Sequence, residues 1–236
     1  MKLFPRIIIP FLIPYLIISC SKTLDVPLPI TSTDAKALEL YNQGYNLLIQ
    51  NEWLEAKNLF EEALTIDPDL ILANLFISET DPNKRKNYRD HAIANKNNGS
   101  EAEKLRVNIY VAERDGRLKD VVNFSKELVS KYPNSSEGYT ILGNAYTAVQ
   151  DFDNAIVQYN KALKINSEQY LAWRGLASHQ VNIGGNLLLP KERQTKALAL
   201  KYTEGMIKTR PKAAFSYQVR ANVERQYSDF KAAKPI

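Results

Sequence analysis

The feature that most constrains the fold of this chain is a pattern of small and large apolar residues that occurs twice, 99 residues apart. Residues 37–68 and 136–167 align without a gap. The apolar positions are separated mostly by three or four residues, which is the periodicity of one face of an α-helix. The matched positions are Leu40, Gly44, Leu47, Ala56, Phe60, Ala63 and Leu64 in the first copy, and Tyr139, Gly143, Tyr146, Ala155, Tyr159, Ala162 and Leu163 in the second.

The small residues of this pattern have a physical role where two helices cross. A glycine or alanine at the crossing lets the two backbones approach closely, and the larger residues fill the space beside them. Each copy therefore predicts two helices that pack against each other at short range. The positions expected at the crossings are Gly44, Ala56 and Ala63, and Gly143, Ala155 and Ala162.

Both copies resemble the tetratricopeptide repeat, a helix-turn-helix unit of 34 residues. The resemblance extends more loosely over residues 35–235, where Ser100 to Glu103 forms the pattern of a capping box at the start of a further helix. It implies an all-α fold, a right-handed α-α superhelix of about five helix pairs with a C-terminal capping helix, over residues 34–236. The inner groove of such a superhelix is lined mainly by the first helix of each pair.

The amino terminus has the layout of a bacterial signal peptide. Lys2 and Arg6 precede an apolar run of 12 residues, Ile7 to Ile18. A helix that spans a membrane needs about 20 apolar residues, so this run predicts no permanent span. Residues 17–20 resemble the bacterial lipobox, which implies a signal peptide over residues 1–19 and a lipid attached to Cys20.

Cys20 is the only cysteine in the chain, so no intramolecular disulfide can form. Residues 20–33 carry Pro27 and Pro29 and few large apolar residues at helical spacing, which predicts a flexible tether with a reach of roughly 40 Å. By the resemblance to lipoproteins, Ser21 after the cysteine favours the outer membrane, with the folded part facing the periplasm. A conventional signal peptide followed by an unmodified cysteine is the alternative.

Charge and motifs exclude several classes of function. The net charge of +5 includes Lys2 and Arg6 of the expected signal peptide, and the remainder is too small to indicate nucleic-acid binding. His91 and His179 lack carboxylate or cysteine neighbours at metal-ligand spacing and are expected to be surface or groove side chains. The chain has neither a GxSxG elbow nor a phosphate-binding loop. We therefore expect no catalytic residues, no cofactor and no bound metal.

Binding residues are expected on the first helix of each pair, on the side that faces away from the crossings at Gly44 and Gly143. Tyrosine and arginine, which are enriched among residues that dominate protein interfaces, occur repeatedly there. For each position taken alone, packing between neighbouring repeats is the competing interpretation. The predicted groove residues are Tyr41, Tyr45, Arg106, Tyr110, Asn144, Thr147, Arg174 and Ser178.

These observations favour a non-catalytic adaptor or assembly factor that is held to the bacterial envelope by lipid and binds other envelope proteins through its groove. The resemblance is compatible with roles in outer-membrane-protein insertion, type IV pilus assembly or peptidoglycan hydrolase scaffolding, and the sequence does not choose among them. Two alternatives stay open: a glycan-binding lipoprotein on a helical-repeat scaffold, and an enzyme whose site is not recognisable from sequence.

Overall fold

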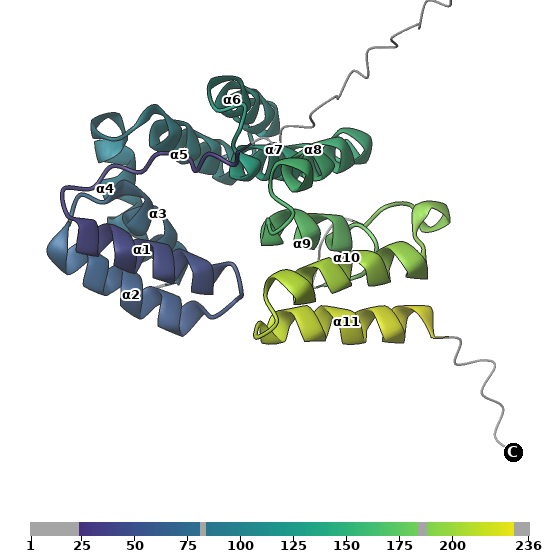
Figure 1. Cartoon of the computed structure of the whole chain (residues 1–236). Coiled ribbons are helices and arrows are strands. Elements are labelled where there is room, and N and C mark those ends of the chain that lie inside the picture. Colours follow the sequence, from purple (N-terminus) through teal and green to yellow (C-terminus); the bar gives the residue numbers. More distant parts are fainter. Residues whose placement is uncertain (1–23, 81–83, 184–187, 229–236) are drawn as a thin grey trace, which may run out of the picture.

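The computed structural model describes residues 24–80, 84–183 and 188–228, and its regular structure is helical throughout these ranges (Figure 1). The α-helices are α1 (Ala35–Leu48), α2 (Trp53–Ile66), α3 (Ile71–Thr80), α4 (Arg85–Asn95), α5 (Glu101–Arg114), α6 (Leu118–Lys131), α7 (Ser136–Ala148), α8 (Phe152–Ile165), α9 (Tyr170–Ser178), α10 (Lys196–Thr209) and α11 (Ala214–Tyr227). Two 3-10 helices, η1 (Lys96–Asn98) and η2 (Lys191–Arg193), lie in the connections.

The helices pack in consecutive pairs: α1 with α2, α3 with α4, α5 with α6, α7 with α8, and α9 with α10. The last helix, α11, packs on α10. The pairs follow an arc, so that the first and last pairs come round to face each other (Figure 1). This architecture confirms the predicted α-α superhelix of five helix pairs with a C-terminal capping helix.

The start of α5 is fixed by the capping box that the sequence predicts. The Ser100 hydroxyl accepts a hydrogen bond from the Glu103 backbone N–H at 3.2 Å, and the Glu103 carboxylate accepts one from the Ser100 backbone N–H at 2.8 Å. Both N–H groups lie at a helix end, where they would otherwise have no backbone partner. The helix therefore begins at Glu101, directly after the cap.

The turns inside three of the helix pairs share one backbone feature. Asn51, Gly116 and Gln150 have φ angles of 68°, 70° and 61°, and each follows closely on the end of the first helix of its pair. Helices commonly end in a residue of this left-handed conformation, which reverses the chain direction. Only Gly116 adopts it without the steric cost of a Cβ atom.

The glycines of the repeated pattern lie where an aromatic ring of the second helix crosses the first helix. A Cβ atom added to Gly143 would be 2.6 Å from Cε1 of Tyr159, and one added to Gly44 would be 3.0 Å from Cε1 of Phe60. A larger side chain at either position would push the two helices apart. The alanines of the pattern are fully buried at the same crossings: Ala56, Ala63, Ala155 and Ala162.

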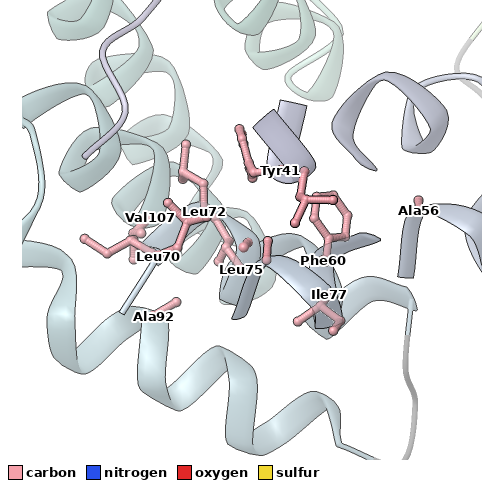
Figure 2. Close-up of a cluster of buried hydrophobic side chains, with 13 residues drawn as sticks. Tyr41, Ala56, Phe60, Leu70, Leu72, Leu75, Ile77, Ala92 and Val107 are labelled. Atoms are coloured by element: carbon pink, nitrogen blue, oxygen red, sulfur yellow. The ribbon is translucent and has the colours of Figure 1, made fainter. Parts of the chain in front are cut away.

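The apolar core runs along the repeats as a series of clusters, each shared by neighbouring helices. The first cluster joins side chains from α1 to α5, and Figure 2 shows Tyr41 and Phe60 in the same cluster as Leu72, Leu75 and Val107. A helix pair cannot bury its apolar face alone, so each pair depends on the next for its stability.

Residues 24–33 are bound to the helical body as an extended segment, which we call the strap. Leu28 is only 3% exposed and packs in a cluster with Ala102 and Leu105 of α5. Figure 1 shows the segment running past α5 towards the start of α1. This corrects the expectation of a flexible tether for these residues. The expected signal peptide and Cys20 lie outside the described residues.

Hydrogen bonds hold the first part of the strap to the turns before α7 and after α8. The Asp25 carboxylate accepts from the Ser136 backbone N–H at 2.8 Å, the Ser136 hydroxyl at 2.7 Å and Nδ2 of Asn166 at 2.8 Å. The backbone N–H of Val26 donates to the Asn134 carbonyl at 3.0 Å. A carboxylate at Asp25 also suits the positive end of the α7 dipole.

Two carboxylates of the body hold the second part of the strap. The Glu103 carboxylate accepts from the Thr31 backbone N–H at 2.9 Å. The Asp67 carboxylate accepts from the Ser32 hydroxyl at 2.7 Å and from the Thr33 backbone N–H at 2.9 Å. Burial alone would raise the pKa of Asp67, but these hydrogen bonds outweigh it and lower the pKa. The strap therefore joins the first, third and fourth helix pairs.

The turn between α1 and α2 contacts the last third of the chain, although 125 residues separate the groups that meet. Nη1 of Arg174 on α9 donates to the Ile49 carbonyl and to Oδ1 of Asn51, both at 3.3 Å. The Ile49 side chain packs against the cluster that contains Tyr170 and Val223. The superhelix thus closes on itself around its concave side, an arrangement that sequence reasoning did not predict.

We expect Gly143→Ala to destabilise the protein relative to Gly138→Ala, although both residues lie in α7. The new Cβ at position 143 would meet the Tyr159 ring and cost about 1 to 3 kcal/mol of overpacking. At position 138 the nearest atom is 3.5 Å away, which is ordinary contact, so the higher helix propensity of alanine makes that change neutral or stabilising by up to about 1 kcal/mol. Urea unfolding of both variants measures the difference, and equal stabilities would contradict a close crossing at Gly143.

A second pair of variants tests whether the strap belongs to the fold. Leu28→Ala should lower the free energy of unfolding by about 2 to 4 kcal/mol, because it removes a buried side chain. Leu24→Ala, at a position that is 80% exposed, should change it by no more than about 0.5 kcal/mol. Thermal and urea unfolding check both values. A Leu28→Ala variant as stable as the parent would show that the strap is free.

Candidate functional site

Two adjoining cavities on the concave side form the candidate functional site. The aromatic cavity, of about 230 Å³, is lined by Tyr45, Leu75, Phe76, Arg106, Ile109, Tyr110, Glu113, Glu137, Thr140, Ile141, Asn144 and Leu171. The polar cavity, of about 410 Å³, is lined by Asn144, Thr147, Tyr159, Leu171, Arg174, Gly175, Ser178 and Ile183. Most of these residues come from the first helices of the pairs, and the two cavities share Asn144 and Leu171.

Seven of the eight predicted groove residues line these cavities. Those in the aromatic cavity are Tyr45, Arg106, Tyr110 and Asn144; those in the polar cavity are Asn144, Thr147, Arg174 and Ser178. A larger hollow, of about 640 Å³, is lined by residues of α2, α3 and α4 and contains none of the predicted groove residues. The structure therefore brings together side chains that come from four separate helices.

Tyr41 is the exception, and its placement corrects the expectation that it lines the groove. It is 1% exposed, and its ring lies 6.0 Å from that of Phe60 and 6.4 Å from that of Phe76. These rings from α2 and α3 cover it, so it belongs to the core shown in Figure 2. Burial raises the pKa of the Tyr41 phenol well above its ordinary value.

A buried ion pair forms one wall of the aromatic cavity. Nη2 of Arg106 lies 3.2 Å from Oε1 of Glu137, and the Tyr45 hydroxyl donates to the same oxygen at 3.1 Å. The guanidinium carbon is 5.1 Å from the centre of the Phe76 ring and 5.6 Å from that of Tyr45. Burial disfavours the charge on Arg106, but the nearby Glu137 carboxylate outweighs it and raises the pKa.

Glu137 was not among the predicted site residues. In the sequence it is only an acidic residue in the first turn of a helix, and its two partners come from α1 and α5. No spacing along the chain could have signalled this contact. Because Arg106 is already paired with Glu137, a partner carboxylate would have to compete with an internal one, and a free carboxylate clamp does not form at Arg106.

A chain of hydrogen bonds forms the floor of the polar cavity. The Tyr159 hydroxyl donates to Oδ1 of Asn144 at 2.7 Å and lies 3.2 Å from the Thr147 hydroxyl oxygen. That oxygen lies 2.9 Å from Nε2 of His179. Burial raises the pKa of Tyr159 to about 12, and the hydrogen bond with Thr147 acts in the opposite direction. The Tyr159 phenol is therefore neutral at physiological pH.

The two histidines have different environments. His91 is partly exposed, and its Nε2 lies 3.1 Å from Oδ1 of Asp69. His179 is 1% exposed behind the polar cavity, with its ring 5.1 Å from that of Phe152 in an edge-on arrangement. This corrects the expectation of a surface or groove side chain for His179. Burial, assisted by the positive charge of Arg193, lowers the pKa of His179 to about 4.

Arg174 gives the polar cavity its positive charge. It hydrogen-bonds to neutral oxygens of Ile49 and Asn51, and its guanidinium carbon lies 4.7 Å from the centre of the Phe215 ring. No carboxylate within the described ranges forms an ion pair with it. Burial lowers the pKa of Arg174, and Tyr170 partly opposes this shift. A carbonyl or negatively charged group of a ligand would complement this wall.

The composition of the two cavities suits the binding of a peptide segment. In the part of the chain that the structure describes, His, Cys, Asp and Glu side chains form no group of three or more that could hold a metal ion. None of the described helices has both the length and the apolar character needed to cross a membrane. The two cavities are lined by aromatic, aliphatic, amide, hydroxyl and guanidinium groups and by the carboxylates of Glu113 and Glu137, a mixture that suits recognition of a peptide surface.

Paired helices, a closed arc and a concave site of mixed aromatic and polar groups define a helical-repeat scaffold. Two segments, residues 37–70 and residues 136–169, each match a family model described as the tetratricopeptide repeat. The chain therefore contains two tetratricopeptide repeats, formed by α1–α2 and α7–α8. These are the two segments in which the sequence pattern is clearest. Together they cover less than half of the chain.

Solved structures similar to this chain include a tetratricopeptide repeat protein from Parabacteroides merdae, at 16% identity and a TM-score of 0.44, covering 81% of this chain and 73% of that one. PilW, a widely conserved type IV pilus biogenesis factor, has 15% identity and a TM-score of 0.44, and the match covers 83% of this chain and 96% of PilW. Pseudomonas aeruginosa pilF has 19% identity and a TM-score of 0.42, and the match covers 84% of this chain and 87% of pilF. No curated protein matches the chain.

We expect His179 to make the stability of the protein depend on pH. Its pKa is about 4 in the fold and about 6.5 in the unfolded chain, so the unfolded state binds the proton first as pH falls. The stability that His179 contributes is complete above about pH 6.5 and is lost towards pH 4, with a total of about 3 kcal/mol. Urea unfolding of the parent and of His179→Gln between pH 7.5 and pH 4 measures this loss.

The partly exposed His91 provides the control for this experiment. His91→Gln should retain the steep loss of stability between pH 6.5 and pH 4, whereas His179→Gln should flatten it. Parallel curves for the parent and His179→Gln would contradict the assignment of a buried, neutral imidazole.

Proposed function

We propose that this protein is a non-catalytic adaptor or assembly factor that binds partner proteins through its concave site. Proteins built from tetratricopeptide repeats typically mediate protein–protein interactions, and their curved stacking creates the binding surface. The single observation that supports the proposal is the convergence of seven predicted groove residues on two adjoining cavities. The two cavities form a continuous recognition strip because Asn144 and Leu171 belong to both.

The chemistry of the strip indicates what kind of segment it would take. The aromatic cavity has Tyr110 and Phe76 on its walls and suits an apolar side chain. The polar cavity next to it has Arg174, Asn144 and Thr147, which suit backbone carbonyls or an acidic side chain. An extended segment or a helix of a partner that presents an apolar group beside a polar or acidic one fits both cavities.

The place of action is also part of the proposal. The N-terminal layout of Lys2 and Arg6, an apolar run and Cys20 supports processing to a lipoprotein, with a lipid on Cys20 as the anchor. By the same resemblance, the protein would act on the outer membrane, facing the periplasm. The partners would then be other proteins of the bacterial envelope.

The binding test needs a substitution that fills both cavities and leaves the hydrogen bonds that close the arc intact. Tyr45 and Arg174 are unsuitable because they hold Glu137 and the α1–α2 turn. Leu171→Arg places bulk and charge on the wall that both cavities share. We expect it to weaken partner recovery by about tenfold or more, as loss of a central interface contact does.

Val157→Arg is the matched control, since Val157 is 56% exposed on α8 and lines neither cavity. Both variants, expressed as the full chain, are affinity-purified from membranes beside the parent, and the recovered proteins are quantified by mass spectrometry. Melting curves check that both variants fold. Equal recovery of the same proteins with Leu171→Arg and with Val157→Arg would refute the concave site.

A further inference from the structure

The first three residues of the strap include two apolar side chains that face away from the body. Leu24 is 80% exposed and Val26 is 43% exposed, whereas Asp25 between them turns inward to Ser136 and Asn166. Neighbouring residues of an extended chain point to opposite sides, so fixing Asp25 on the body forces both neighbours outward. Leu24 and Val26 therefore form a small exposed apolar patch at the beginning of the strap.

The short stretch of chain between Cys20 and Asp25 limits how far the beginning of the strap can lie from Cys20. Asp25 lies five positions after Cys20, and five steps along the chain span at most roughly 18 Å even when fully extended. The reach of roughly 40 Å expected for a free tether required all residues to Thr33 to be unbound. Because the strap is bound from Asp25 onward, most of that reach is lost.

The turns that hold Asp25 carry basic side chains as well. Lys131 and Lys164 are exposed in the last turns of α6 and α8, close in sequence to Asn134 and Asn166. Apolar side chains flanked by lysines are the composition that favours the interface between water and lipid. Lys131 is paired with Glu127 at 3.7 Å and with Glu101 at 3.9 Å, and Glu168 is an exposed acidic residue on the same turns, so the apolar pair contributes most of this preference.

We propose that this edge of the superhelix, residues 132–136 and 166–169 with Leu24 and Val26, rests on the bilayer surface. The inference depends on the lipid anchor at Cys20 that belongs to the proposed function. The strap keeps the lipid anchor close to the body and thereby holds the α6–α7 and α8–α9 turns against the membrane. The opposite ends of these helices point away from it.

Fluorescent labels at the two ends of α6 test this orientation. Ser130→Cys and Lys119→Cys place single thiols at exposed positions about 16 Å apart along the helix. In the lipidated chain these are the only free thiols, because Cys20 is blocked. Each labelled protein is bound to vesicles of phosphatidylcholine and phosphatidylglycerol that carry an acceptor dye on a headgroup, and energy transfer is measured.

We expect clearly stronger transfer from position 130 than from position 119. Inserting about twelve glycine and serine residues between Thr23 and Leu24 should weaken transfer from position 130 and reduce the difference. The double variant with Leu24→Ser and Val26→Ser should also weaken transfer from position 130 and reduce the difference, but to a smaller extent. Equal transfer from both positions in the unmodified tether would overturn the proposed edge while leaving the anchor intact.

Failure of the anchor itself is detected separately. The intact mass of the membrane-extracted chain shows whether Cys20 carries lipid before any distance is measured. A chain without lipid would overturn both the anchor and the edge proposal. The concave site is tested by a separate comparison, namely the partner recovery of Leu171→Arg against that of Val157→Arg.

Discussion

The close approach of paired helices at positions without a bulky side chain is the constraint on which the rest of this structure depends. The Tyr159 ring lies against both Gly143 of α7 and Gly175 of α9, so one aromatic side chain joins its own pair to the next. Trp173 packs against Gly205 of α10 in the same manner. Each glycine removes a Cβ that would hold the helices apart, and the ring supplies the apolar contact that replaces it. The curvature of the arc, and with it the concave site, follows from these crossings.

Contacts between distant parts of the chain then complete the shape. The strap contacts the first, third and fourth helix pairs, where its polar groups pair with Asp67 directly after α2, Glu103 in the first turn of α5 and Ser136 at the start of α7. On the other side of the arc, Arg174 joins α9 to the turn after α1. A solenoid whose repeats contact only their neighbours can flex along its length. These two long-range connections oppose such flexing and maintain the two cavities as one site.

The concave surface shows how structural and binding roles divide among similar residues. Arg106 and Tyr45 both face the aromatic cavity, yet both are committed to the Glu137 carboxylate. Arg174 is partly buried, and its partners are neutral oxygens, so its charge is not compensated by a carboxylate. An unpaired cation in a partly dry cavity attracts a negative group far more strongly than an exposed one does. The polar cavity is therefore the more selective half of the strip.

The sequence by itself determined the helix pairs, their number, the small residues at two crossings and the capping box at Ser100, because each of these depends on residues within one repeat. It also predicted a shared face for seven residues that line the two cavities, since helical periodicity fixes which side chains share a face. The tertiary structure alone decided that Tyr41 is covered by Phe60 and Phe76, that His179 is buried, and that Glu137 meets Arg106. It also decided that residues 24–33 bind the body. Those outcomes depend on which helices lie beside one another, and no periodicity within a repeat carries that information.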